Sequence, residues 1–127
     1  ELKDVVDLSQ VAAIAGSAQQ HGSVYLRGSF AETLAGLRSD QPLADQLAGV
    51  FTRATAPIWM DSSTSEDCRA IDAALGGAAE TQRITGSAAY ERFTGPQIRR
   101  FARTEPAAWQ ATGHVRLPGR RDAGKAR

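Results

Sequence analysis

Three polar stretches of this sequence contain the residue types that an oxygen-rich ligand requires. In residues 19–22, "QQHG", two amides and His21 offer several directional hydrogen-bond donors and acceptors. Asp61 follows the short apolar run "APIWM" and could serve as a base or a metal ligand. Arg92 lies in "YERFTG", where its guanidinium can pair with ligand oxygens while aromatic neighbours hold its stem. The donors and acceptors of "QQH" suit a ligand rich in hydroxyl groups, such as a sugar.

Each stretch also has an ordinary structural explanation. His21 can be a solvated turn residue, and Asp61 can cap the following helix or bond to "SST". Arg92 can form a surface ion pair with an acidic neighbour. Residue spacing alone favours the ordinary role for His21 and Asp61, and it leaves the role of Arg92 open.

Other kinds of chemistry have little support in the residue spacing. A metal site built from His21, Cys68 and His114 lacks any ligand spacing, and no "GxSxG" motif supports a catalytic triad. Residues 119–126, "GRRDAGKA", have the spacing of a phosphate loop but lack the Ser or Thr that binds magnesium, a preceding strand and room for a helix. The sequence therefore predicts no catalytic, cofactor-binding or metal-binding residue.

The composition indicates one small globular domain. The 127 residues are 42% hydrophobic, and the net charge of +1 argues against whole-molecule attraction to nucleic acid or to anionic membranes. Residues 1–115 carry a net charge of −3 and residues 116–127 carry +4, so the end of the chain differs in kind. Cys68 is the single cysteine, which favours a reducing cytoplasm, and no apolar run approaches the roughly 20 residues that span a bilayer.

The polar stretches must be positioned by a mixed framework of strands and helices. Periodicity predicts strands at 11–18 and 23–27, joined as a hairpin with Gly22 supplying the positive φ of its turn. Residues 56–61 are expected to run as a strand into the next helix, with Asp61 near that helix's N-terminus. Capping residues and amphipathic patterns predict helices at 29–37, 42–51, 62–77, 77–85, 94–103 and 105–112. The expected fold class is α/β, with strands early and helices late.

The segment 62–77 has the strongest helix pattern in the chain. Thr64 or Ser63 is expected to cap its N-terminus, and an apolar stripe that begins at Cys68 would face the core. Gly76 is expected to end the helix.

Three longer segments include these polar stretches, in the order "SAQQHGSVYL", "IWMDSSTSEDCRAIDAALGG" and "TGSAAYERFTGPQI". In this order and at these separations they resemble the N-terminal domain of the xylulokinase branch of the FGGY carbohydrate kinases. The likeness extends over about residues 11–117. It implies an α/β, ribonuclease-H-like (actin-like ATPase) fold, with residues 1–117 forming an incomplete N-terminal sugar kinase domain.

The resemblance also implies a function. FGGY xylulokinases transfer the γ-phosphoryl group of MgATP to the 5-hydroxyl of D-xylulose, which gives D-xylulose 5-phosphate in pentose metabolism. By similarity, His21 and Arg92 would contact the ketose, with Gln20 and Asp61 as weaker candidates. ATP and magnesium are expected in the full-length family and not on this chain, and the expected location is cytoplasmic.

The sequence also departs from the family pattern. The glycine-containing "D-x-G-T" phosphate hairpin is expected upstream of Glu1, and the catalytic aspartate and ATP-binding domain are expected after Leu117. Residues 118–127 are expected to be a disordered basic tail. The expectation is a kinase fragment that is inactive alone and has the rest of the kinase as its partner. The alternative is a non-catalytic sugar-binding or protein-interaction module derived from such a domain.

Overall fold

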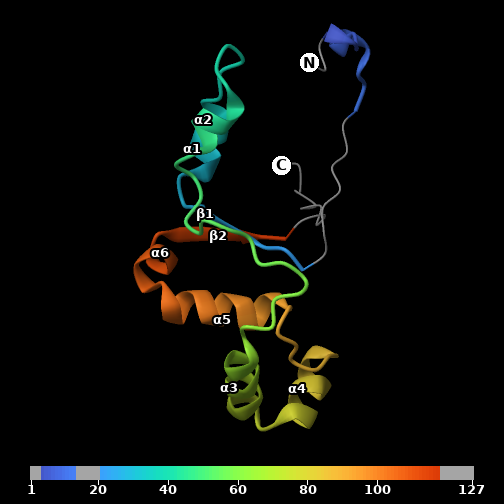
Figure 1. Ribbon diagram of the computed structural model, residues 1–127, viewed down its shortest axis with the longest axis vertical. Helices are drawn as coiled ribbons and strands as arrows, with labels where there is room; N and C mark the ends of the chain where they lie inside the picture. Colours follow the sequence, from blue (N-terminus) through green and yellow to red (C-terminus); the bar gives the residue numbers. More distant parts are fainter. Residues whose placement is uncertain (1–3, 14–20, 118–127) are drawn as a thin grey trace, which may run out of the picture.

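A computed structural model of the protein describes residues 4–13 and 21–117. Figure 1 shows the small sheet in the middle of the molecule, with α1 and α2 on one side and α3 to α6 on the other. The elements are η2 (Leu8–Gln10), β1 (Val24–Arg27), α1 (Phe30–Ala35), α2 (Leu43–Leu47), α3 (Ser65–Leu75), α4 (Ala78–Thr85), α5 (Thr94–Thr104), α6 (Pro106–Gln110) and β2 (Thr112–Arg116). The six expected helices are therefore present, although α1, α2 and α6 are shorter than predicted.

Strand β1 has a partner on each side. It pairs antiparallel with β2, with Leu26 opposite His114. On its other side, Arg27 N donates to Val50 O (2.9 Å) and Thr52 N donates to the carbonyl of the strand's Tyr25 (3.0 Å). Both edges of β1 are thus occupied by later segments, and most of the first strand of the expected hairpin lies outside the described residues.

Two expectations about strands are wrong. Residues 56–60 form no strand, and β2 is a late strand in a region where only helices were expected. Within the predicted early strand, residues 11–13 are not in a strand and residues 14–20 lie outside the described residues. The predicted tail at 118–127 also lies outside them.

Aromatic side chains join the sheet to α5 and α6. Tyr25 is 1% exposed, and its ring lies 4.7 Å from that of Phe101, which is fully buried. Trp109 of α6 meets Phe101 edge to face at 6.2 Å. Burial of such large rings is a main source of stability in a small domain, so this cluster fixes α5 against β1.

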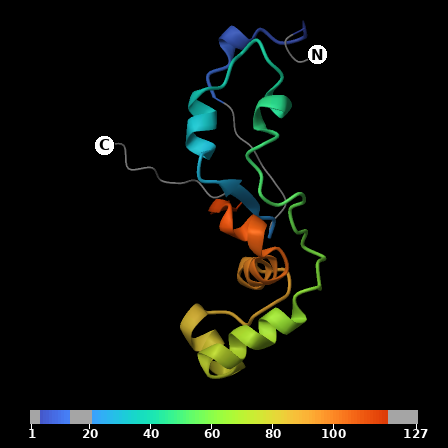
Figure 2. The same ribbon diagram turned by 90° about the vertical axis from the view of Figure 1, so that its left-hand side faces the viewer.

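A buried carboxylate joins α3 to α5. Asp67 is 0% exposed, and it lies 2.6 Å from Arg99 Nη1 and 3.1 Å from Arg103 Nη2. Figure 2 shows α3 and α4 together below α5. Helix α3 ends as expected at Gly76, which adopts the left-handed conformation with φ +95°. This frame holds the N-terminus of α3 beside the segment that contains Arg92.

Candidate functional site

His21 has an unusual backbone conformation for a residue with a side chain. Its φ is +67°, and it is the only non-glycine residue with a positive φ in ranges 4–13 and 21–117. The sequence suggested that Gly22 would supply the positive φ of this turn. In the structure the positive φ belongs to His21. A positive φ is uncommon for a residue with a side chain, and histidine is one of the residue types that adopt it more often than most. The half-buried imidazole stacks on Phe93, with ring centroids 5.5 Å apart and an interplanar angle of 22°.

Arg92 is exposed and surrounded by aromatic rings. Its guanidinium carbon lies 5.5 Å from the ring centroid of Tyr90 and 5.8 Å from that of Phe93. Tyr90 and Phe93 also meet edge to face at 5.4 Å. The guanidinium forms no ion pair within the described part of the chain, so the ordinary surface ion pair is not observed there. Its hydrogen-bond donors remain available for a ligand.

Phe93 brings the two predicted contacts together. Its ring touches the imidazole of His21 and lies beside the guanidinium of Arg92. Residue types and spacing gave Phe93 no ligand role, and the one signal in the sequence is its place next to Arg92 in "YERF". Phe93 therefore forms a shared apolar support for two side chains that are far apart in the sequence.

Asp61 has the ordinary structural role. Its Oδ1 accepts a hydrogen bond from Ser63 N at 2.8 Å, which stabilises the turn before α3. Burial acts to raise the pKa of Asp61, but hydrogen bonds from Ser63 and Gln97 and the positive charge of Arg100 outweigh it, so the pKa is lowered. Asp61 is therefore ionised at neutral pH. Gln20, the other weaker candidate, lies outside the described residues.

Asp61 and Arg92 nevertheless line the same surface hollow. This open cavity has a volume of about 330 Å³. An ionised carboxylate on one wall and a guanidinium on the other can accept from and donate to ligand hydroxyl groups. Its lining residues are Trp59, Met60, Asp61, Ser62, Glu91 and Arg92. The structure thus brings the "WMDS" and "YER" segments to one place.

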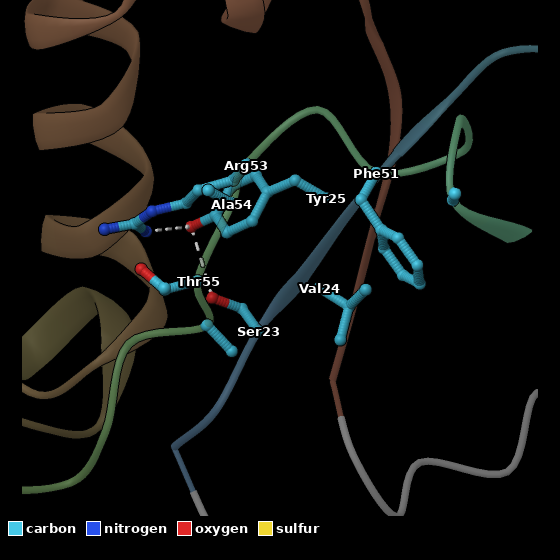
Figure 3. Close-up of a pocket in the computed structure, with 9 residues that line it drawn as sticks. Ser23, Val24, Tyr25, Phe51, Arg53, Ala54 and Thr55 are labelled. Atoms are coloured by element: carbon cyan, nitrogen blue, oxygen red, sulfur yellow. Dashed lines mark hydrogen bonds between the residues drawn. The ribbon is translucent and has the colours of Figure 1, made fainter. Parts of the chain in front are cut away.

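A second cavity of about 390 Å³ lies beside β1 (Figure 3). Within it, Ser23 Oγ donates to Tyr25 Oη at 3.2 Å, and Arg53 Nη1 donates to the same oxygen at 3.4 Å. The guanidinium of Arg53 also lies over the rings of Tyr25 (5.2 Å) and Phe101 (5.3 Å). These polar groups bond to one another, and their contacts join Arg53 to the aromatic core.

The described residues form neither a metal site nor a reactive thiol site. No group of three or more His, Cys, Asp or Glu side chains in ranges 4–13 and 21–117 could hold a metal ion. Cys68 is buried, and burial together with the nearby charge of Glu91 raises the pKa of its thiol. No helix in this part of the chain is long and apolar enough to cross a membrane.

Comparison with proteins of known name shows which sequences this chain is similar to. The chain is 48% identical over 111 residues to Xylulose kinase 2 of Arabidopsis thaliana, and the match covers 87% of this chain and 20% of that relative. It is 44% identical over 115 residues to D-xylulose kinase A of Aspergillus niger, with 91% of this chain and 20% of the relative covered. This chain is a homologue of xylulose kinases. It spans about a fifth of the length of these curated relatives.

Further comparisons agree with this lineage. Xylulose kinase of Mus musculus is 44% identical over 111 residues, with 87% of this chain and 20% of the relative covered. A crystal structure described as a xyloylose kinase from Brucella ovis superposes with a TM-score of 0.59 at 24% identity, and covers 87% of this chain and 18% of that one. The predicted α/β sugar kinase fold is confirmed, as a partial unit with a small sheet. No protein-family model matches the chain.

Proposed function

We propose that the chain supplies part of the ketose site of an ATP-dependent D-xylulose kinase, with His21 and Arg92 as the contacts to the sugar. The observation that carries this proposal is the meeting of both side chains at Phe93, with His21 stacked at 5.5 Å and Arg92 at 5.8 Å. In addition, the xylulose kinases compared above match 87–91% of this chain. A half-buried imidazole and an unpaired guanidinium on one apolar support suit a small polyhydroxylated carbonyl compound.

The two side chains have complementary tasks in such a site. The imidazole of His21 can donate to one ligand oxygen and accept from another hydroxyl, whereas the guanidinium of Arg92 only donates. Fixing two positions of D-xylulose would restrict its rotation and point its 5-hydroxyl in one direction. In the complete reaction that hydroxyl would receive the γ-phosphoryl group of ATP and give D-xylulose 5-phosphate.

The described residues provide no fit for the magnesium ion of that reaction. No acidic cluster among them could hold it, and we assign no step to it here. We propose that ATP and magnesium are held by the parts of a xylulose kinase that this chain does not match, and that those parts are its partner. A cytoplasmic location and a role in pentose metabolism belong to the same proposal.

Binding of D-xylulose to the 127-residue chain tests the site. We expect His21→Gly and Arg92→Met each to raise the Kd measured by NMR titration about tenfold, which corresponds to ~1.4 kcal/mol. Glycine is chosen at position 21 because it accepts the positive φ of this turn. The matched controls are His114→Gly in β2 and Arg83→Met on α4, where Arg83 pairs with Glu80.

The controls should retain the Kd of the unaltered chain. Equal weakening by a control and its test variant would show a general loss of structure and contradict the assignment. Absence of any saturable D-xylulose binding by the unaltered chain would contradict the proposed function of the chain itself.

Catalysis by the chain alone is a separate prediction. With ATP, magnesium and D-xylulose present, we expect no D-xylulose 5-phosphate above the uncatalysed background. Phosphoryl transfer depends on a positioned metal and nucleotide, and the described residues hold no cluster for that metal. Production of D-xylulose 5-phosphate at typical kinase rates of about 1–100 s⁻¹ would contradict this prediction.

A further inference from the structure

The backbone carbonyl of Glu91 is held by two buried side chains. Thr64 Oγ1 donates to it at 2.7 Å, and Gln97 Nε2 donates to it at 3.1 Å. Both donors belong to side chains that are 0% exposed. Thr64 or Ser63 was expected to cap α3; Thr64 occupies the N-cap position, but its hydroxyl makes no capping bond and donates to Glu91 O instead. A carbonyl with two donors uses both of its lone pairs, so its position is tightly fixed.

This carbonyl belongs to the residue immediately before Arg92. Thr64 reaches it from the start of α3, and Gln97 reaches it from the first turns of α5. Ser65 Oγ adds a third bond, to Glu91 Oε1 at 3.0 Å. The segment before Arg92 is therefore clamped between two helices.

The segment after Arg92 is held as well. Phe93 N donates to Tyr90 O at 2.9 Å, and Gln97 N donates to Phe93 O at 3.2 Å. Arg92 itself is exposed, its guanidinium lies over the rings of Tyr90 and Phe93, and its charge helps to lower the pKa of Glu91. The direction of its guanidinium thus depends on the backbone that carries it.

We propose that Thr64 and Gln97 are positioning residues for the ketose site: they fix the Glu91 carbonyl and thereby aim Arg92 and place the Phe93 ring under His21. This inference rests on the proposed function. Gln97 also helps to lower the pKa of Asp61, which lines the hollow together with Arg92. Loss of either donor leaves the Glu91 carbonyl with a single bond and gives the Arg92 turn more freedom.

Isosteric substitutions of Thr64 test this role. Thr64→Val keeps the shape and removes the hydroxyl, whereas Thr64→Ser keeps the hydroxyl. Thr81→Val is the matched control, because Thr81 is also buried at 2% exposure and its Oγ1 bonds only within its own helix, to Gly77 O at 3.2 Å. Gln97→Met removes the second donor at similar length. The Gln97 Oε1 atom has no partner in the described residues, so Met deletes no bond at that atom.

Two readouts separate positioning from ligand binding. The first is the hydrogen-exchange rate of the Phe93 amide, which reports how firmly the turn is held without any ligand. The second is the Kd for D-xylulose by NMR titration. We expect Thr64→Val and Gln97→Met to speed exchange about tenfold and to raise the Kd at least fivefold, with Thr64→Ser close to the unaltered chain and Thr81→Val unchanged in both.

Each alternative result has a definite meaning. Unchanged exchange and unchanged Kd in Thr64→Val would overturn the positioning role while leaving the proposed function intact. Faster exchange with an unchanged Kd would also overturn it, because the clamp would then be structural only. If the unaltered chain does not bind D-xylulose, the proposed function fails. The inference about the ketose site fails with it, whatever the exchange rates show.

Discussion

The imidazole of His21 lies on the ring of Phe93, with centroids 5.5 Å apart, and Arg92 lies beside the same ring at 5.8 Å. Tyr90 closes the group through its edge-to-face contact with Phe93 at 5.4 Å. Phe93 is thus the common neighbour of one residue that precedes β1 and of two that precede α5. Contact through a rigid ring sets the spacing between an imidazole and a guanidinium without a direct bond between them.

Removing this ring should disturb both polar groups together. In Phe93→Leu, we expect D-xylulose binding to weaken about tenfold, because aromatic contacts worth about 0.5–1.5 kcal/mol each are lost at His21 and Arg92. The His21 ring protons should also lose the ring-current shift that the stacked phenyl group causes. Both effects can be measured in one NMR titration.

Phe51→Leu is the matched control for this substitution. Phe51 is 46% exposed. It forms a β-bridge with Leu26 along the edge of β1 that does not face β2. Its substitution should leave the His21 shifts and the Kd unchanged. A Phe93→Leu variant with native His21 shifts would contradict the stacked arrangement.

The buried carboxylate of Asp67 predicts a pH dependence of stability. Burial acts to raise the pKa of Asp67, but hydrogen bonds from Arg103 and Arg99 outweigh it and lower the pKa from its ordinary value of 3.8. A carboxyl whose pKa is lower in the folded state stabilises that state above its unfolded pKa. This contribution is lost as the pH falls through the folded pKa. The free energy of unfolding should therefore decrease as the pH falls below about 5.

Asp67→Asn should remove this dependence. At pH 7 we expect the variant to lose about 1–3 kcal/mol of unfolding free energy, because both arginines lose their anionic partner and the amide NH₂ that replaces one carboxylate oxygen cannot accept a hydrogen bond. Urea unfolding between pH 2 and pH 7 should show the difference shrinking as the pH falls. Asp40→Asn is the control, since the Arg38–Asp40 pair is largely exposed at 63% and 62% and should contribute little. A constant difference across this pH range would refute the assignment to Asp67.

Local sequence patterns predicted most of the helical frame. The helix at Ser65–Leu75 was expected from its acidic first turn and its terminal Gly76, and both features act over a few residues. Strand β1 was expected from local alternation. These elements depend on interactions between near neighbours, which a single sequence displays directly.

Long-range partners account for what local patterns missed. Strand β2 contains Gly113 and polar residues, and it is a strand because it pairs with β1. The apolar run at 56–60 pairs with no strand of the described residues and is not itself a strand. Thr64 or Ser63 was expected to cap α3, and Thr64 does occupy the N-cap position, but its hydroxyl donates to the distant carbonyl of Glu91. The candidates His21 and Arg92 were assigned from resemblance, and their shared contact with Phe93 required three-dimensional coordinates.

The contact between Gly113 and Gly28 gives the sharpest test of the β1–β2 pairing. A Cβ atom added to Gly113 would lie 2.5 Å from Gly28 Cα and 2.7 Å from Gly28 N, which is backbone that cannot move aside cheaply. A Cβ atom on Gly28 would meet nothing within 4 Å. The same close approach thus tolerates a methyl group on one glycine and not on the other.

We expect Gly113→Ala to lower the free energy of unfolding by about 1–3 kcal/mol, as overpacking does elsewhere. Gly28→Ala should leave it within about 1 kcal/mol of the unaltered chain, because a methyl group in open space only restricts the unfolded chain. Urea unfolding followed by circular dichroism measures both values. If the two variants are equally stable, the backbones of β2 and the segment after β1 do not approach as described, and the pairing that holds β1 at the centre of the molecule would need revision.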